Sequence, residues 1–204
     1  MGFVRDEAWY KELDAEIGLL LESGLERIVL AIDGSSAAGK SSLAAELGEK
    51  YDAHVFHIDD YFLTDEQRTE ERLAAVGEFF DKERVLTEVL EPLRGGEDVL
   101  LCRRFNCATQ GFSEAESVGR KRVYIIEGVY SLHPDLRPFY DLQLFLYVER
   151  AEQIRRLELR CPEKLERYLN DWLPREEAYF VKYGLPTKSS LVPKSSLVPG
   201  TECE

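Results

Sequence analysis

Residues 34–41 read Gly-Ser-Ser-Ala-Ala-Gly-Lys-Ser and match the phosphate-loop pattern G-x-x-x-x-G-K-[ST] at every defined position. The apolar residues 28–32 precede this stretch and the helix-prone residues 43–50 follow it, which is the strand, loop and helix context that the pattern requires. A turn of glycine and serine that only joins a strand to a helix is the alternative interpretation. The surrounding context favours phosphate binding.

Each part of the loop has an expected role. Successive backbone N–H groups would surround phosphate oxygens, Lys40 would contact the β- and γ-phosphates of ATP, and the Ser41 hydroxyl would bind Mg²⁺. A helix that begins at Gly39 adds the positive end of its dipole to the same anion site. The expected nucleotide-binding residues of the loop are Gly34, Ser35, Ser36, Ala37, Ala38, Gly39, Lys40, Ser41 and Ser42.

The composition limits the kinds of partner. With 204 residues the chain fits one domain of ordinary size. Its 26 basic and 39 acidic residues give a formal charge of −13, which argues against a non-specific nucleic-acid or anionic-membrane surface, because both partners are negative. A phosphate site must therefore be built locally from lysine, arginine and backbone amides.

The cysteines and the hydropathy pattern indicate which cellular compartment to expect for this protein. Cys102, Cys107, Cys161 and Cys203 form no C-x-x-C pair and have no histidine at metal-ligand spacing, so we interpret them as reduced thiols of a cytoplasmic protein. Cys102 and Cys107 as half of a metal site is a weaker alternative. No stretch approaches the roughly 18 apolar residues of a membrane-spanning helix, and the acidic N-terminus lacks the layout of a signal peptide. We expect neither export nor membrane insertion.

Apolar patterns along the chain predict alternating helices and strands. Strands are expected at residues 27–33, 54–58, 99–101, 123–126 and 142–148, and helices at residues 5–23, 41–51, 81–93 and 149–183, the last interrupted by Pro162 and Pro174. Residues 64–77 are interpreted as an exposed loop and helix, and residues 102–119 as irregular. The alternation predicts an α/β fold, a parallel sheet with helices on both faces.

Acidic residues end two of the predicted strands. Asp59 follows residues 54–58 and Glu127 follows residues 123–126, and strand ends on one side of a parallel sheet share the ligand crevice. Phosphoryl transfer needs in-line positioning, neutralisation of charge and a group that orients or deprotonates the acceptor. Asp59 is the candidate base, with a water-mediated Mg²⁺ ligand or a helix cap as alternatives, and Glu127 is the candidate metal-orienting acid.

Further stretches extend the similarity beyond the loop. They are Ile-Asp-Gly-Ser-Ser-Ala-Ala-Gly-Lys-Ser (32–41), Ile-Asp-Asp-Tyr-Phe (58–62), Phe-Phe-Asp-Lys-Glu-Arg-Val (79–85), Ile-Ile-Glu-Gly-Val-Tyr-Ser-Leu-His-Pro (125–134) and Asp-Leu-Gln-Leu-Phe-Leu-Tyr-Val (141–148). Together they resemble the uridine kinase family, in the group of P-loop kinases that includes phosphoribulokinase, pantothenate kinase and nicotinamide riboside kinase. The resemblance implies a P-loop NTPase three-layer sandwich with a parallel sheet and a helical, arginine-rich lid.

The resemblance also implies roles for single residues. Asp59 would be the base toward a nucleoside 5′-hydroxyl, Glu127 would help to hold Mg²⁺, and Asp81 would contact the ribose hydroxyls. Arg156 and Arg160 would belong to the lid over the phosphates. For this arginine-rich stretch, a solvated face that pairs with neighbouring glutamates is the alternative.

The segment expected to contact the acceptor departs from the family. Residues 103–107 read Arg-Arg-Phe-Asn-Cys, whereas the subgroup that they resemble has Arg-Pro-Phe-Asp-Cys, so recognition of a pyrimidine does not carry over. Arg103 would bind an acidic or phosphorylated acceptor, or pair with nearby carboxylates, and both interpretations stay open. The expected substrate-binding residues are Asp59, Tyr61, Asp81, Arg103 and Phe105.

We divide the chain into three segments. Residues 1–26 contain an amphipathic helix that packs on the domain, residues 27–186 form the P-loop kinase domain, and residues 187–204 form a tail. In the tail Lys-Ser-Ser-Leu-Val-Pro occurs twice, at residues 188–193 and 194–199. A tandem hexapeptide with two prolines is typical of a flexible or docked extension, and we assign it no chemistry.

These features favour an ATP-dependent small-molecule kinase that phosphorylates the 5′-hydroxyl of a nucleoside such as uridine. The alternatives are a kinase of another hydroxyl-bearing metabolite, similar to nicotinamide riboside or pantothenate, a nucleotide-dependent switch ATPase, and a degraded family member with a scaffold role. The intact Lys40, Ser41, Asp59 and Glu127 argue against the last. The acceptor, the choice between ATP and GTP, and the oligomeric state, a homo-oligomer included, are left open.

Overall fold

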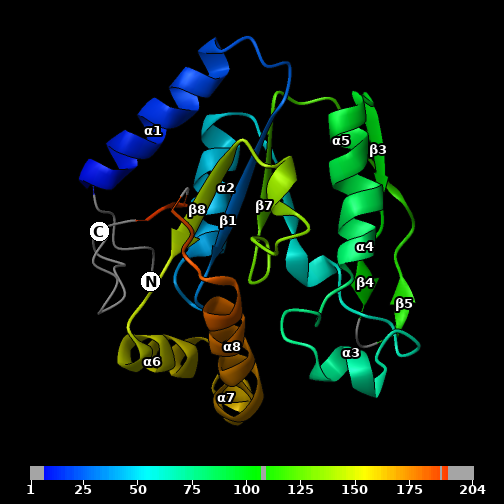
Figure 1. Ribbon diagram of the computed structural model, residues 1–204, viewed down its shortest axis with the longest axis vertical. Coiled ribbons are helices and arrows are strands. Elements are labelled where there is room, and N and C mark those ends of the chain that lie inside the picture. The colour runs from blue at the N-terminus through cyan, green and yellow to red at the C-terminus, as the bar shows by residue number, and fades with distance from the viewer. Residues whose placement is uncertain (1–6, 107–108, 189, 193–204) are drawn as a thin grey trace.

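The computed structural model describes residues 7–106, 109–188 and 190–192. Parallel strands form its five-stranded central sheet, in the order β2, β7, β1, β8, β9. Their bounds are His54–His57 (β2), Val123–Glu127 (β7), Ile28–Gly34 (β1), Leu142–Leu146 (β8) and Ser190–Leu191 (β9). Helices cover the sheet on both faces (Figure 1), so the predicted α/β fold with a parallel sheet is confirmed.

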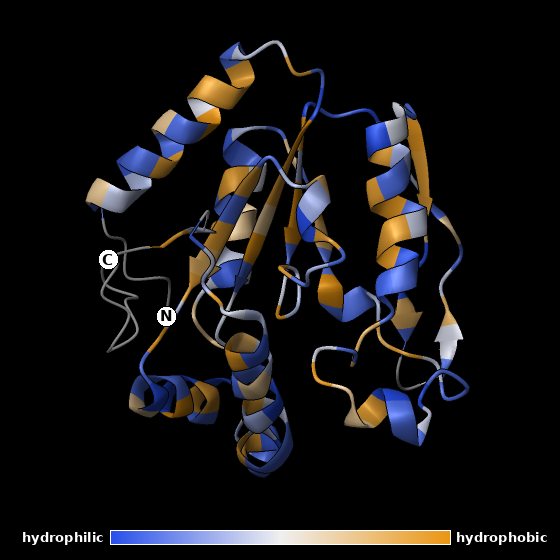
Figure 2. Ribbon diagram, viewed as in Figure 1, coloured by the Kyte–Doolittle hydropathy of each residue, from blue (hydrophilic) through white to orange (hydrophobic). Residues whose placement is uncertain are grey.

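Two hydrophobic cores lie on opposite faces of the sheet. Side chains of a strand alternate between its faces, so Leu30 of β1 packs in the core below α1 (Glu7–Glu22) and α2 (Lys40–Lys50), while Val29 packs in the other. That second core contains Val89, which lies between α4 (Lys82–Val85) and α5 (Glu91–Gly95). Figure 2 shows β1 and β7 as mostly hydrophobic, as expected for strands buried on both faces.

The remaining helices gather at one end of the molecule (Figure 1). They are α3 (Glu70–Ala74), α6 (Arg150–Arg160), α7 (Leu165–Arg167) and α8 (Leu173–Tyr183). The helix predicted over residues 149–183 is interrupted at Pro162, where a short turn replaces it. At Pro174 the chain stays helical but changes type: a π-helical turn at Tyr168–Trp172 ends and α8 begins at Leu173, with Pro174 in its first turn.

Residues 102–119 are not irregular, and this prediction is wrong. β3 (Val99–Cys102) pairs antiparallel with β6 (Glu116–Gly119), and β4 (Phe105–Asn106) pairs with β5 (Gly111–Phe112). β3 lies outside the central sheet. It is half exposed, with Val99 and Leu101 at 50% and 62% exposure. All of its residues are apolar, so its alternation between core and solvent leaves no trace in the sequence.

The beginning of the predicted tail is part of the sheet. β9, which belongs to the first copy of the repeat, pairs in parallel with β8 at the sheet edge. The second copy, residues 194–199, lies outside the described residues, as do residues 5–6 of the predicted first helix, Cys107 and Cys203. Within the described ranges no helix is both long and apolar enough to cross a membrane.

Candidate active site

The end of β1 leads directly into the loop at residues 34–41. Gly34 has a φ of +129°, and a Cβ at this position would lie 1.8 Å from the Leu146 carbonyl oxygen, so the close approach of β8 requires glycine. Gly39, with a φ of 101°, is the N-cap of α2, which begins at Lys40. The positive end of α2 therefore faces the loop, as an anion site requires.

Lys40 lies against this loop. Its side chain is buried, and its ammonium group donates to the carbonyl oxygens of Gly34 at 2.9 Å and of Ser35 at 3.0 Å. Both acceptors are backbone atoms of the loop itself. The positive charge is therefore kept at the place where the phosphate-loop pattern expects a nucleotide.

Ser41, Glu127 and His57 form one hydrogen-bonded group. The Ser41 hydroxyl donates to Glu127 Oε1 at 3.1 Å, and His57 Nδ1 lies 2.5 Å from the same oxygen. The hydrogen bond to Glu127 raises the pKa of His57, and partial burial lowers it less. A hydroxyl and a carboxylate are oxygen ligands of the kind that Mg²⁺ prefers, with phosphate and water completing its coordination. Two of the three expected metal ligands, Ser41 and Glu127, are thus adjacent, and Asp59 is the third.

His57 was not predicted as part of this group. It stands opposite Glu127 because β2 pairs with β7 in the register His57↔Glu127. Sequence patterns indicate that both segments are strands but not that they are neighbours. No signal in the sequence could have identified His57 without the strand order.

Asp59 lies in the short turn Ile58–Asp60 that follows β2. Burial raises the pKa of its carboxyl group, and the charge of Lys40 opposes this effect. Asp60 points elsewhere, because its Oδ2 lies 3.8 Å from Arg104 Nε. The structure therefore separates the two acids, and of the two only Asp59 lines the cavity with the loop.

A cavity of about 210 Å³ joins these groups. Its polar lining comes from the loop and the start of α2, namely Ser36, Ala37 and residues 39–42, and from Asp59 and Glu127. Its aromatic lining comes from four separate segments: Phe62, Phe79, Phe80, Tyr130, Tyr168 and Trp172. The cavity thus has a polar lining and an aromatic lining.

Four expected acceptor residues do not line this cavity. Asp81 is buried at 1% exposure and caps α4, accepting from the Arg84 backbone N–H at 3.1 Å and from the Gln67 amide at 2.8 Å. Tyr61 is also buried, with the Arg84 guanidinium 4.9 Å from its ring centroid. Packing inside the domain accounts for both side chains, so their expected contact with an acceptor does not follow from their placement.

Of the other two, Phe105 lies on β4 and Arg103 lies in the connection between β3 and β4. Arg103 donates to Glu88 Oε1 at 2.8 Å, and its guanidinium lies 4.9 Å from the Phe112 ring centroid. Phe105 packs edge-to-face on the same Phe112 ring at 5.4 Å. The structure therefore favours the carboxylate-pairing interpretation of Arg103 over binding of an acidic acceptor.

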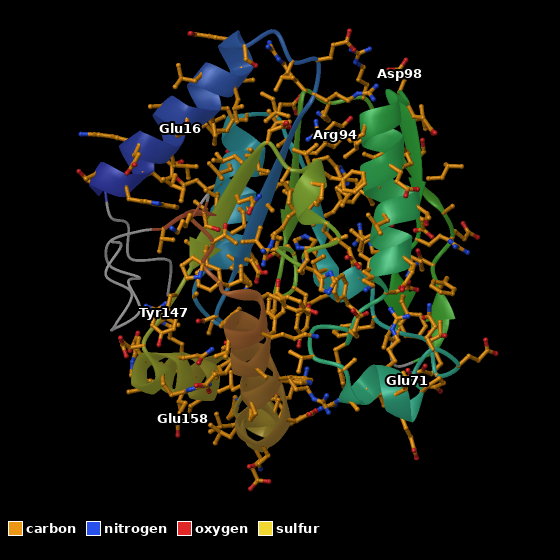
Figure 3. All side chains as sticks on the ribbon, viewed as in Figure 1. Glu16, Glu71, Arg94, Asp98, Tyr147 and Glu158 are labelled. Atoms are coloured by element: carbon orange, nitrogen blue, oxygen red, sulfur yellow. The ribbon has the colours of Figure 1, made fainter. Side chains whose placement is uncertain are left out.

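The two lid arginines extend from α6. Arg160 lines the cavity, and Arg156 Nη1 donates to the Ala37 carbonyl oxygen of the loop at 3.2 Å. Arg156 also pairs with Glu152 at 2.7 Å. Glu158 of the same helix points outward, away from the sheet (Figure 3). One side of α6 therefore faces the loop and another is the solvated face of the alternative interpretation.

α8 also contacts the loop, which the sequence did not predict. Glu176 Oε2 accepts from the Ser36 backbone N–H at 2.8 Å, and one turn later the Tyr179 hydroxyl donates to Asp33 Oδ2 at 2.8 Å. Asp33, the last residue before the loop, is fully buried, and burial raises its pKa to about 6. The spacing Glu-x-x-Tyr predicts that both side chains lie on one helix face, but it does not show that this face contacts the loop.

No protein-family model matches the chain. Its structure is similar to that of a protein described as a possible uridine kinase from Bacillus stearothermophilus, with 21% sequence identity, a TM-score of 0.60, and coverage of 88% of this chain and 98% of that one. A deoxyadenosine kinase from M. mycoides with bound dATP gives a TM-score of 0.39 at 15% identity, covering 84% and 93%. The first likeness shows a shared α/β fold.

Proposed function

We propose that this protein is an ATP-dependent small-molecule kinase that phosphorylates a hydroxyl group of a ring-bearing acceptor, such as the 5′-hydroxyl of uridine or another nucleoside. One observation carries the proposal: phosphate-loop residues, Asp59 and a group of aromatic side chains line the same cavity. A kinase needs a donor site and an acceptor site that meet at the transferred group. The fold shared with the possible uridine kinase supports the same assignment.

The charged side chains of the cavity suit the binding of ATP, the phosphate donor. Lys40 and Arg160 would neutralise phosphate oxygens as the γ-phosphoryl group moves. Mg²⁺, held by Ser41 and Glu127, would supply further positive charge. Asp59 lines the same cavity as Lys40 and Glu127. Its raised pKa suits a general base that accepts the proton of the acceptor hydroxyl.

The aromatic lining favours one class of acceptor. Ring side chains such as Phe79, Tyr130 and Trp172 bury a planar ring well, and offset or edge-to-face ring pairs add about 0.5–1.5 kcal/mol beyond the area they bury. A flexible, ring-free acceptor similar to pantothenate would gain less there. A nucleoside, in which a planar base is joined to a hydroxyl-bearing sugar, matches both the aromatic and the polar lining of the cavity.

The proposal is tested by product formation. Purified protein is incubated with Mg-ATP and a panel of pyrimidine and purine nucleosides, nicotinamide riboside, pantothenate and simple sugars, and phosphorylated products are identified by mass spectrometry. We expect a nucleoside monophosphate and ADP in equal amounts. Hydrolysis of ATP without any phosphorylated acceptor, stimulated by a partner protein, would instead indicate a switch ATPase.

Asp59→Asn tests the proposed base. General-base catalysis contributes about 10²- to 10⁴-fold, so we expect kcat to fall by at least about 100-fold while the dissociation constant for Mg-ATP changes little. Asp60→Asn is the matched control, since it makes the same change one residue away at a carboxylate directed toward Arg104. Loss of ATP binding in Asp59→Asn would assign this residue to the metal or to the fold instead.

A further inference from the structure

Glu176 brings a buried carboxylate into the phosphate loop. Its side chain is 4% exposed, and Oε2 accepts from both the Ser36 backbone N–H at 2.8 Å and the Ser36 hydroxyl at 2.7 Å. Oε1 accepts from Gln153 Nε2 at 2.8 Å, and the same amide group donates to the Ser36 carbonyl oxygen at 3.1 Å. Every hydrogen-bonding group of Ser36 thus has a partner on α6 or α8.

Glu176 forms no ion pair within 4 Å with a lysine or arginine in the described ranges of the chain. Its hydrogen-bond partners in the described part of the chain are the uncharged groups of Ser36 and Gln153, whereas the adjacent Glu177 pairs with Arg150 at 2.7 Å. The Ser36 N–H belongs to the set of loop amides that the phosphate-loop pattern assigns to an anion. A carboxylate of the protein itself therefore uses one of these donors.

Glu176 also lines the cavity together with Lys40 and Ser41. A nucleotide whose phosphates lie along the loop would bring further negative charge close to this carboxylate. The interaction of two like charges is strengthened where water is partly excluded, and it grows with the number of charges on the ligand. The carboxylate should therefore oppose a triphosphate more strongly than a diphosphate.

We propose that Glu176 acts as an internal anion of the phosphate loop: it positions Ser36 before nucleotide binds, and its charge sets the affinity for the polyphosphate and the preference between ATP and ADP. This inference rests on the proposed function only in that the loop binds a nucleotide. It assigns Glu176 as a positioning residue, since it acts on the nucleotide through the loop and through charge and takes no part in the transfer.

The test compares three proteins by calorimetric titration with Mg-ATP and Mg-ADP, without an acceptor. Glu176→Gln keeps the size of the side chain and an oxygen for Ser36 but removes the charge. We expect it to bind ATP about fivefold to tenfold more tightly than the unaltered protein, and ADP with a smaller gain. Glu177→Gln removes the same charge from the exposed neighbour and should leave both affinities unchanged.

A gain in affinity distinguishes this role from a structural one, because damage to the fold would weaken binding. Unchanged or weaker ATP binding by Glu176→Gln would overturn the proposal. Glu176→Asp, which keeps the charge and shortens the side chain, should bind ATP no more tightly than the unaltered protein. An equal gain in both Glu176 variants would show that packing, not charge, is responsible and would also overturn it.

The two proposals fail in different ways. If the unaltered protein binds Mg-ATP but phosphorylates no acceptor, the proposed function is wrong and the role of Glu176 is still decided by the titrations. If a nucleoside is phosphorylated and Glu176→Gln shows no gain in ATP affinity, only the inference about Glu176 is wrong.

Discussion

At the scale of single residues, Asp33 shows how the strand that precedes the loop is tied to the rest of the site. Its carboxylate accepts from the backbone N–H groups of Gly34 at 2.6 Å and Leu132 at 2.8 Å and from the Tyr179 hydroxyl at 2.8 Å. Burial is the largest effect on this group and raises its pKa to about 6, although the three hydrogen bonds and Lys40 lower it. One side chain thus joins β1, the segment after β7, and α8.

The raised pKa of Asp33 predicts a pH-dependent stability. The folded-state value lies above the roughly 3.9 of an unfolded aspartate, so the free energy of unfolding falls as the pH rises from about 4 to about 6 and is constant above that. Asp33→Asn carries no charge and should lack this fall. Relative to the unaltered protein, its free energy of unfolding should rise by roughly 2–3 kcal/mol between about pH 4 and pH 7.

Urea unfolding at a series of pH values measures this difference. The lost acceptor for the Leu132 N–H destabilises Asp33→Asn at every pH, which shifts its curve without changing the pH dependence. Parallel stability curves for the two proteins would contradict the prediction. They would mean that Asp33 is ionised in the folded protein at the same pH as in the unfolded chain.

At the scale of elements, the small antiparallel strands are held by an arginine between two rings. The guanidinium of Arg84 lies 4.9 Å from the Tyr61 ring centroid and 4.6 Å from that of Phe112, and it pairs with Glu88 at 3.1 Å. Cation–ring contacts of this kind contribute about 0.5–2 kcal/mol each. The segment that departs from the resembled family therefore has a structural role beside the site.

β9 is the other element whose role the structure revealed, and truncation tests it. A chain that ends at Thr187 loses β9, its backbone pairing with β8 and the packing of the half-buried Leu191. We expect the free energy of unfolding to fall by about 1–3 kcal/mol, since each net backbone hydrogen bond contributes about 1 kcal/mol and the buried apolar area adds to it. Thermal and urea unfolding measure the loss.

A chain that ends at Val192 is the matched control for this truncation. It keeps β9 and the first copy of the repeat except Pro193, and lacks only residues 193–204. We expect its stability to equal that of the full chain. An equal loss in both truncated chains would assign the stabilising contact to the second copy of the repeat.

At the scale of the whole molecule, the cavity is a product of the entire sheet. Its polar lining lies where β1, β2 and β7 end side by side, and Tyr168 and Trp172, just before α8, belong to its aromatic lining. A ligand that contacts both linings would touch segments far apart in the sequence, from residue 36 to residue 176. Binding should therefore stabilise the folded protein globally.

Saturation with Mg-ATP tests this coupling. At a concentration 100 times its dissociation constant, a ligand of the folded state adds about 2.7 kcal/mol, which for a protein of this size raises Tm by about 5–10 °C. Lys40→Ala should abolish the shift. Lys50→Ala, at the other end of α2 and paired with Asp14, should keep it. A full shift in Lys40→Ala would place the nucleotide away from the loop.

Local patterns determined much of the fold. The phosphate-loop pattern, the apolar strands and the acids that end them are properties of consecutive residues, so β1, β2, β7 and β8 and the common edge of Lys40, Asp59 and Glu127 could be predicted. The strand predicted at residues 99–101 is present as β3, but its uniformly apolar sequence did not show that it pairs with β6. The prediction that residues 102–119 are irregular failed because strands as short as β5 leave no periodic pattern.

The sequence by itself thus determined an α/β fold with a parallel sheet and the place of the phosphate-loop pattern at the end of β1. Only the tertiary structure decided that β7 lies between β1 and β2, which brings His57 to Glu127, and that Glu176 reaches Ser36, 140 residues earlier in the chain. The physical reason is the same in both cases. A hydrogen bond between distant segments depends on how the whole sheet and its helices pack, and no spacing along the chain records that packing.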